Sequence, residues 1–346
     1  MSGNSSAITI ATFPSVQLQG ILRYAIGSAI IMMVALGFDY QLAYFTPVLA
    51  LNFLAPTAKA PTLKSSAGFL FSVGIASFAG VVFSRFFLAY PLVFLPLLAL
   101  ILFHIYYTTA LQSMKVWLII SLLLIPMMSL QSAELGSIVA VNLFVNALLA
   151  VLLAWVINFI FPNTGTVVAS DKKNAVDQPS ARQRFISAIT KSMVVIPVVV
   201  VFFVFNWSGS MLILFFIAIL SMNPAAANKK TSVAMILANL GGGLAAIIVF
   251  NLLTAATSFI YSGMLTLLVG LLFANGLFSG KPTAPLFGMA FSTFLLILGN
   301  VISLAGEAGD IVWARVFQIG VAMVYMVITF RLIDRMGFIK KLKSEG

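Results

Sequence analysis

Residues 22–56 decide the fold; they read LRYAIGSAIIMMVALGFDYQLAYFTPVLALNFLAP. An apolar run over 20–37 is long enough, at about 1.5 Å per residue, to cross the hydrocarbon core of a membrane as a helix. A polar and aromatic break follows at 38–40, and the next apolar run, over 42–55, is too short to cross as a straight helix. The stretch therefore predicts one membrane-crossing helix and, directly after it, an unusually short one.

The same order of features returns in the second half of the chain. A break over 205–207 is followed by a short apolar run over 210–223, by two lysines and by a run rich in glycine. The offset is 167 residues, as between Gly74 and Gly241 (241 − 74). Such a duplicated membrane unit is typical of transporters rather than of enzymes.

The composition places most of the chain in a membrane. It is 62% hydrophobic and 8% charged, which leaves too few polar side chains to cover a water-soluble fold. The apolar runs do not alternate with period two, so helices are favoured over a β-barrel. We expect an all-α integral membrane protein with about 12 transmembrane helices, at 20–37, 42–55, 66–84, 91–108, 116–131, 137–161, 190–206, 210–223, 232–256, 263–279, 285–305 and 312–333.

A polar linker divides these helices into two similar halves. Residues 163–183, NTGTVVASDKKNAVDQPSARQ, are mostly small, polar or charged. We therefore expect a first half over 1–165, and a second unit over 166–346 that holds the cytoplasmic linker and the remaining helices. Each half would hold about six helices, an even number, which predicts parallel repeats related by an axis along the membrane normal.

The basic residues determine the expected orientation. With the N-terminus inside, 17 of the 19 Lys and Arg residues fall on the cytoplasmic side, and Arg85 and Arg315 fall outside (19 − 17 = 2). This asymmetry predicts that both termini are cytoplasmic. The formal net charge of +11 is then explained by topology and by contact with anionic lipid headgroups, not by binding of nucleic acid.

Residue counts and motifs argue against enzyme chemistry. The chain has no cysteine and a single histidine, His104, so neither a thiolate nor a His-rich metal site is expected. No G-x-x-x-x-G-K-[ST] phosphate loop occurs, and the cluster Gly241 to Gly243 is better explained by close helix packing, with a hinge as the alternative. We expect no enzyme activity, no cofactor, no metal and, because the N-terminus lacks a basic start, no cleavable signal peptide.

These sequences resemble a known family of inner-membrane transporters. The opening LRYAIGSAIIMMVALGF (22–38), then FDYQLAYFTPVLALNFLAP (38–56) and a glycine-rich third span ending in GVVFSRFF (80–87) are similar to the fusaric acid resistance (FUSC-like) family, which includes the aromatic acid exporters. The resemblance implies a multi-pass protein of the inner membrane that exports aromatic carboxylates or related toxic compounds, with a periplasmic adaptor protein as partner. This chain would be a minimal member that lacks the large cytoplasmic domains of the long exporters.

The short second span carries the first group of candidate binding residues. Unusually short or interrupted segments in matching places of two repeats are the best sequence indication of a transporter's binding site. Pro47 is expected to remove an intrahelical hydrogen bond and free a carbonyl, and Tyr44, Thr46 and Asn52 lie around it. A broken helix would also present its N-terminus to an anion; the equal alternative is a helix that is simply short and tilted.

Three further residues could contact an anionic substrate. Arg23 lies just inside the first span, where a guanidinium can bind a carboxylate in a bidentate fork, although snorkelling to the headgroups is the favoured alternative. Asn142 and Asn146 are four residues apart on one face of the sixth span and are the residues best suited to line a pathway. Most other Asn residues in the spans, such as Asn239, are expected to form interhelical hydrogen bonds.

Two residues are candidates for proton coupling. His104 lies within the fourth span, and imidazole is the side chain that exchanges a proton near neutral pH. The favoured alternative is a place in an interfacial aromatic belt, because Tyr106 and Tyr107 follow it. Asp39 lies at the outer end of the first span, where a solvated loop charge is the ordinary case and proton uptake from outside is the alternative.

The sequence therefore predicts export of a small organic anion across the inner membrane, driven by a proton or electrochemical gradient. The membrane potential favours the expulsion of anions by about 2.3 kcal/mol per charge per 100 mV. Two alternatives stay open: a passive anion channel, and a membrane subunit of a larger assembly without transport of its own. Besides the substrate, the adaptor and membrane lipids, a second copy of the chain in a homo-oligomer is the remaining candidate partner.

Overall fold

The computed structural model describes residues 15–38, 40, 42–56, 58, 60–108, 112–162, 180–205, 229–255 and 258–303, with single positions at 317, 321, 325, 328 and 329. Over these residues the fold is entirely helical. The helices are α1 (Ser15–Gly37), α2 (Phe45–Leu54), α3 (Leu63–Phe87), α4 (Pro91–Tyr107), α5 (Gln112–Ser129), α6 (Ala133–Ile160), α7 (Ala181–Val204), α9 (Lys229–Ala255), α10 (Phe259–Leu277) and α11 (Ala284–Ser303).

Seven of the described helices are long and apolar enough to cross a membrane, namely α1, α3, α6, α7, α9, α10 and α11. Together with α2, α4 and α5 they match ten of the expected spans to within a few residues, except at the start of α7. The expected span at 210–223 and nearly all of that at 312–333 lie outside the described residues. The architecture is that of a multi-pass membrane protein.

Helix α7 begins nine residues before the span expected from position 190 (190 − 181). Its start is set by a capping box, in which the Ser180 hydroxyl accepts from the Gln183 backbone N–H and the Gln183 side chain accepts from the Ser180 backbone N–H. Thr62 and Ser65 form the same arrangement at the start of α3. Hydropathy locates the apolar part of such helices, whereas the polar caps determine where they begin.

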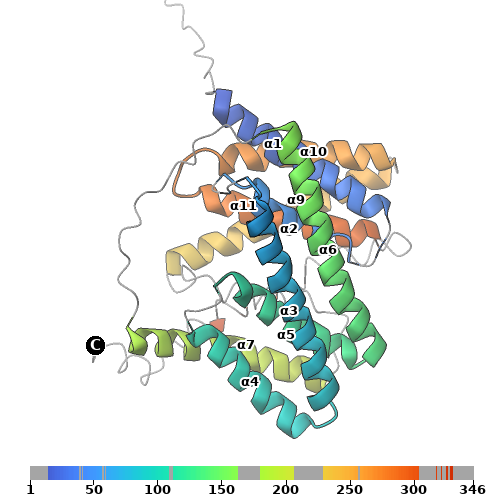
Figure 1. Cartoon of the computed structure of the whole chain (residues 1–346). Coiled ribbons are helices and arrows are strands. Elements are labelled where there is room, and N and C mark those ends of the chain that lie inside the picture. The colour runs from blue at the N-terminus through green and yellow to red at the C-terminus, as the bar shows by residue number, and fades with distance from the viewer. Residues whose placement is uncertain are drawn as a thin grey trace, which may run out of the picture.

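The helices pack in recurring pairs. Helix α3 packs along α5, and α9 packs along α11. Helix α1 packs along α10 near the top of Figure 1, and α4 packs along α7 near the bottom. The short helix α2 lies against α6, α1 and α11. Helix α1, the first described helix, is thus paired with α10, and α7, the first described helix after residue 162, is paired with α4.

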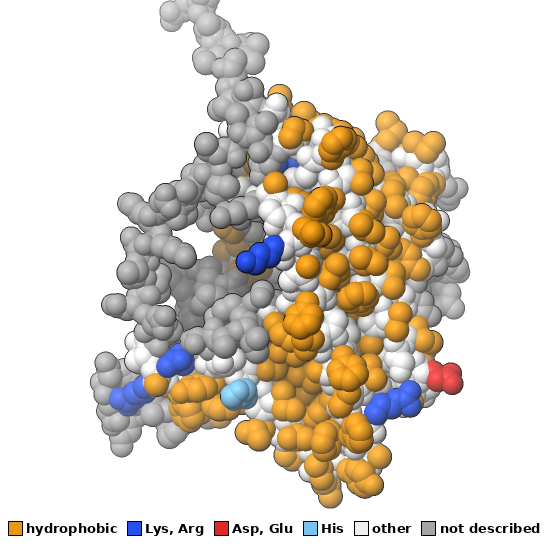
Figure 2. All heavy atoms as spheres, viewed as in Figure 1, with side chains coloured by type: hydrophobic (Ala, Val, Ile, Leu, Met, Phe, Trp, Pro, Cys, Tyr) orange, Lys and Arg blue, Asp and Glu red, His pale blue; other side chains and the backbone are white. Residues whose placement is uncertain are grey.

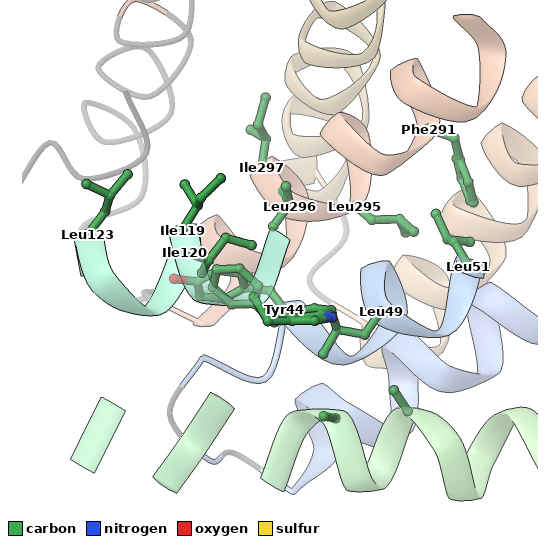
Figure 3. Close-up of a cluster of buried hydrophobic side chains, with 14 of the residues drawn as sticks. Tyr44, Leu49, Leu51, Ile119, Ile120, Leu123, Phe291, Leu295, Leu296 and Ile297 are labelled. Atoms are coloured by element: carbon green, nitrogen blue, oxygen red, sulfur yellow. The ribbon is translucent and has the colours of Figure 1, made fainter. Parts of the chain in front are cut away.

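The core is centred on α11, whose side chains are mostly buried from Ala290 to Val301. Gly242 of α9 lies so close to α11 that a Cβ atom there would fall 2.0 Å from the carbonyl oxygen of Ala290. Helix α9 runs unbroken through this glycine cluster, which supports close packing rather than a hinge. Figure 3 shows side chains of α11, α2 and α5 in one buried cluster, among them Phe291, Leu295, Leu296, Ile297, Leu49, Leu51, Ile119, Ile120 and Leu123.

The surface is apolar where a water-soluble protein would be polar. Hydrophobic side chains cover most of the described surface on the face shown in Figure 2. Leu92 of α4 and Phe159 of α6 are 92% and 87% exposed. A surface of this kind is stable against the hydrocarbon interior of a membrane.

Residues at the two ends of α6 show which helix ends lie together. At its C-terminal end the Trp155 indole donates to the Ser66 hydroxyl (3.0 Å), and the rings of Phe69 and Trp117 meet edge to face at 5.4 Å, so the end of α6 and the starts of α3 and α5 lie together. Arg85 lies at the opposite end, beside the start of α6. The other basic residues in the described ranges are Arg23 within α1 and Lys191 within α7, and, at or near helix ends, Lys64, Lys115, Arg182, Arg184, Lys229, Lys230 and Lys281.

Candidate functional site

The chain turns sharply between α1 and α2. The Phe45 N–H donates to the Leu42 carbonyl and the Thr46 N–H donates to the Ala43 carbonyl. Leu42 has a φ of +63°, a left-handed conformation that is uncommon for a residue other than glycine and costs about 1–2 kcal/mol. Backbone strain of this kind is often found at functional sites. The candidate coupling residue Asp39 lies outside the described residues.

A buried chain of hydrogen bonds joins this turn to α6. The Thr46 hydroxyl donates to Oδ1 of Asn146 at 2.8 Å, and both residues are fully buried. The Tyr40 hydroxyl lies 2.5 Å from the Thr46 hydroxyl oxygen, and it is the donor because the Thr46 proton is already given to Asn146. Nδ2 of Asn146 donates in turn to the backbone carbonyl of Asn142 at 2.6 Å.

This arrangement places the start of α2 deep within the helical array. Asn146 is the fourteenth of the 28 residues of α6 (146 − 133 + 1), so Thr46 lies level with the midpoint of that helix. A helix that starts at mid-depth is a recurring feature of transporter binding sites. Here, however, the backbone N–H groups of Phe45 and Thr46 are engaged in the turn and Pro47 has none. The start of α2 therefore offers no open cradle of N–H groups to an anion.

The expectation that Pro47 interrupts a helix is wrong. Pro47 is the third residue of α2, within the first turn, where its missing N–H would have had no intrahelical partner. The Ala43 carbonyl, which would be freed by a proline at this place, accepts from the Thr46 N–H at 3.1 Å. Pro47 thus helps to begin α2 and is buried in the helix contact.

The other predicted residues occupy different surroundings. Tyr44 is buried against α11, because a Cβ atom on Gly299 would lie 2.5 Å from the Tyr44 Cβ. Asn52 is exposed, and its amide donates to the Leu49 carbonyl of the same helix. Asn142 is half-buried, and its amide likewise stays on its own helix, on the Ile138 carbonyl. His104 is exposed on the surface of α4.

Arg23 differs from all of these because no acidic side chain in the described ranges lies near it. The residue is 4% exposed, and its Nε is buried without a hydrogen-bond partner. Glu134 is the only acidic residue that the described ranges contain, and it begins α6. Arg23 lies one turn before Gly27, where a Cβ would fall 2.8 Å from Ile157 near the end of α6. The guanidinium therefore lies far along α6 from that carboxylate.

Burial of Arg23 has a clear cost and a chemical use. A cation within a membrane is expensive, by at least about 2.5 kcal/mol on insertion scales, and such residues usually face a pathway or a partner. One turn after Arg23, Gly27 faces Leu54 and Ile157 at the C-terminal ends of α2 and α6, where helix dipoles place partial negative charge. The free donors of the guanidinium can bind a carboxylate in a bidentate fork.

Two features of the buried polar network were not anticipated from the sequence. Tyr40 was not a candidate, although it ends the polar break from which the short span follows. In the second half, the Thr293 hydroxyl of α11 donates to Oδ1 of Asn239 in α9 at 2.5 Å, and the Asn239 amide donates to the Met235 carbonyl. This confirms the interhelical hydrogen bond expected of Asn239. The sequence offers no signal that Thr293 is its partner.

A family model described as a protein of unknown function (DUF2955) matches residues 20–160. The matched segment runs from within α1 to the end of α6, which is the first six of the described helices. The comparison with curated proteins found no match. The comparison with solved structures found none either.

Proposed function

We propose that this chain is a transporter of the inner membrane that exports small organic anions, with aromatic carboxylates as the favoured class. The observation that carries the proposal is Arg23, a buried guanidinium with an unpartnered Nε on a helix long enough to cross the membrane. The substrate class comes from the resemblance to the fusaric acid resistance family and its aromatic acid exporters. In this proposal the chain is a carrier and not an enzyme.

The architecture proposed is two parallel six-helix repeats, twelve spans in all, with both termini in the cytoplasm. The reciprocal pairing of α1 with α10 and of α7 with α4 supports it, because an axis along the membrane normal would exchange these two pairs. The family match over residues 20–160 supports a first unit that ends with α6. The uneven distribution of Lys and Arg along the sequence supports the cytoplasmic location of both termini.

Transport would begin on the cytoplasmic side, where the sequence predicts most of the Lys and Arg residues. The cations there would concentrate organic anions from the cytoplasm, and Arg23 would be the first residue within the membrane to bind the carboxylate. Passage beyond it would follow α2 and α6, where Tyr40, Thr46 and Asn146 could offer their hydrogen-bonding groups if the two helices separate. Asn142 would line the same face of α6 closer to its start.

The energy would come from the proton gradient or from the membrane potential. His104 and Asp39 remain the proposed proton-coupling residues, and the exposed position of His104 would require it to act from the surface of α4. A periplasmic adaptor protein would be needed to pass the substrate across an outer membrane. A homo-oligomer is the other partner expected from the sequence.

The test is efflux of radiolabelled benzoate from proteoliposomes that contain the purified chain. We expect Arg23→Gln to lower the efflux rate at least about tenfold, the usual effect of losing a charge-assisted hydrogen bond. Lys281→Gln is the matched control, because Lys281 is an exposed cation beyond the end of α10. Efflux by Arg23→Gln at the wild-type rate would overturn the proposed role of Arg23, and no efflux by the wild type would overturn the function.

The same vesicles separate a pump from a channel. With the voltage clamped by potassium and valinomycin, a proton-driven exporter loses directional efflux when the proton gradient is removed. A passive channel follows the voltage alone and is unaffected by that treatment.

A further inference from the structure

Three basic side chains from two helices converge on the last turn of α4 and the residue after it. Lys115 of α5 is buried, and its ammonium group donates to the backbone carbonyl of Thr108. From α7, the Lys191 ammonium lies 5.9 Å from the centre of the Tyr106 ring, and the Arg184 guanidinium carbon lies 5.6 Å from the centre of the Tyr107 ring. Three cations thus contact three consecutive residues.

These cations have no compensating charge within the described residues. Glu134 is the sole acid in those ranges. It lies at the start of α6, directly after the end of α5, whereas Lys115 lies near the start of α5. Lys115 and Lys191 are close enough for their charges to repel each other. Lys115 also lies in the first turn of α5, where the helix dipole is positive and a cation is unfavourable. The cluster is therefore electrostatically costly as it stands.

The donors of the cluster are only partly used. One N–H of the Lys115 ammonium donates to the Thr108 carbonyl. The contacts of Lys191 and Arg184 with the tyrosine rings position these two cations without using their N–H groups. The Nε of Arg184 is buried and has no hydrogen-bond partner. An arrangement of two ammonium groups and one guanidinium with free donors has the composition of an oxyanion site.

We infer that Lys115, Lys191 and Arg184 bind an oxyanion, a carboxylate or phosphate group, at the junction of α4, α5 and α7. Bound there, an anion would cancel the repulsion between the lysines and accept hydrogen bonds from all three side chains. The group can belong to a soluble molecule or to the phosphate of an anionic lipid, because the junction lies at the ends of the helices.

This site goes beyond the proposed transport function and does not depend on it. It shares no residue with the Arg23 position or with the contact between Thr46 and Asn146. Lys191 follows Arg23 by 168 residues (191 − 23), close to the offset of the sequence repeat. The two cations thus lie on α7 and α1, the helices that pair with α4 and α10.

Direct binding to the purified full-length chain tests the inference. The chain is reconstituted in phosphatidylcholine nanodiscs, and binding of radiolabelled benzoate and of inorganic phosphate is measured at equilibrium. Retention of phosphatidylglycerol is measured by native mass spectrometry in a parallel sample. Each of Lys191→Gln and Arg184→Gln should weaken at least one of these three probes by about tenfold or more.

The variants and controls distinguish the outcomes. Lys64→Gln removes an exposed cation at the start of α3 and should leave all three affinities unchanged. Loss of benzoate or phosphate binding identifies a soluble oxyanion, and loss of phosphatidylglycerol identifies a lipid headgroup. Wild-type affinity for every probe in both variants, or no binding of any probe by the wild type, overturns the site. Arg23→Gln should leave phosphate binding and phosphatidylglycerol retention unchanged, whereas its benzoate binding also reports on the proposed transport site. The phosphate and lipid probes therefore separate failure of the transport proposal from failure of this site.

The melting temperature of Lys191→Gln distinguishes a binding role of Lys191 from a purely structural one. Because the lysines repel each other, Lys191→Gln should keep or raise the melting temperature of the ligand-free chain. The stabilisation that a bound probe gives to the wild type should be lost in the variant. A variant that is less stable without ligand and is stabilised by the probe as much as the wild type would contradict the inference.

Discussion

The contact between α2 and α6 and the position of Arg23 on α1 are both polar and both buried, but they differ in how their groups are satisfied. At the contact, Tyr40 donates to Thr46 and Thr46 donates to Asn146. The Asn146 amide then donates to a backbone carbonyl of its own helix. At Arg23 the Nε is buried without a partner. A satisfied network is stable as it is, whereas an uncompensated cation is costly to retain without a ligand. We therefore assign a structural role to the first region while α2 and α6 are packed together, and the first contact with the substrate to the second region.

The largest expected effect on stability is that of Asn146→Leu. It removes the acceptor of the buried Thr46 hydroxyl and leaves that donor unsatisfied, which should lower the free energy of unfolding by about 2 kcal/mol. Asn142→Leu is the matched control, because the Asn142 amide bonds only within its own helix, and it should cost under about 0.5 kcal/mol. The free energies of unfolding are measured by reversible unfolding in detergent. Equal losses for Asn146→Leu and Asn142→Leu would contradict the special structural role of Asn146.

A smaller loss is expected when the middle of the network is removed. Thr46→Val keeps the shape of the side chain and removes the hydroxyl, so it should cost about 1 kcal/mol. Thr46→Ser keeps the hydroxyl and should come close to the wild type. A double-mutant cycle with Tyr40→Phe should show coupling between the two hydroxyl groups, and additive losses would mean that the hydrogen bond between them contributes nothing.

The pair in the second half should be weaker still. Thr293→Val removes a single hydrogen bond to Asn239, and no tyrosine hydroxyl extends this pair as Tyr40 extends the first. It should lower the free energy of unfolding by about 0.6 kcal/mol. Benzoate efflux should be unaffected, since we assign this pair to helix packing between α9 and α11. An efflux defect without a stability defect would place Thr293 in the pathway.

The sequence predicted the helices well because their signal is local. Apolar length set the positions of α1 to α6, and the shortness of α2 followed from a run that ends too soon. The charge pattern predicts which helix ends face the cytoplasm, and this orientation stays a prediction. These properties depend on neighbours along the chain and on the membrane, so a single sequence contains them.

The site could be predicted only in part, because it depends on contacts between distant residues. Thr46 and Asn146 were both candidates, but nothing in the sequence shows that residues 100 apart share a hydrogen bond. Pro47 was misjudged because the turn before it, with Leu42 in a left-handed conformation, starts the helix only two residues before the proline. The cluster around Tyr106 was missed for the same reason, since its cations come from two other helices.

The most direct test of the account measures stability and transport together in Arg23→Met, which keeps an apolar side chain of similar length and removes the charge. The account predicts a free energy of unfolding within about 0.5 kcal/mol of the wild type, or higher, because replacement of a buried charge by an apolar group is often neutral or stabilising. It predicts benzoate efflux lowered at least about tenfold in the same preparation. Loss of stability with efflux per folded molecule unchanged would show that Arg23 supports the structure and does not bind the substrate.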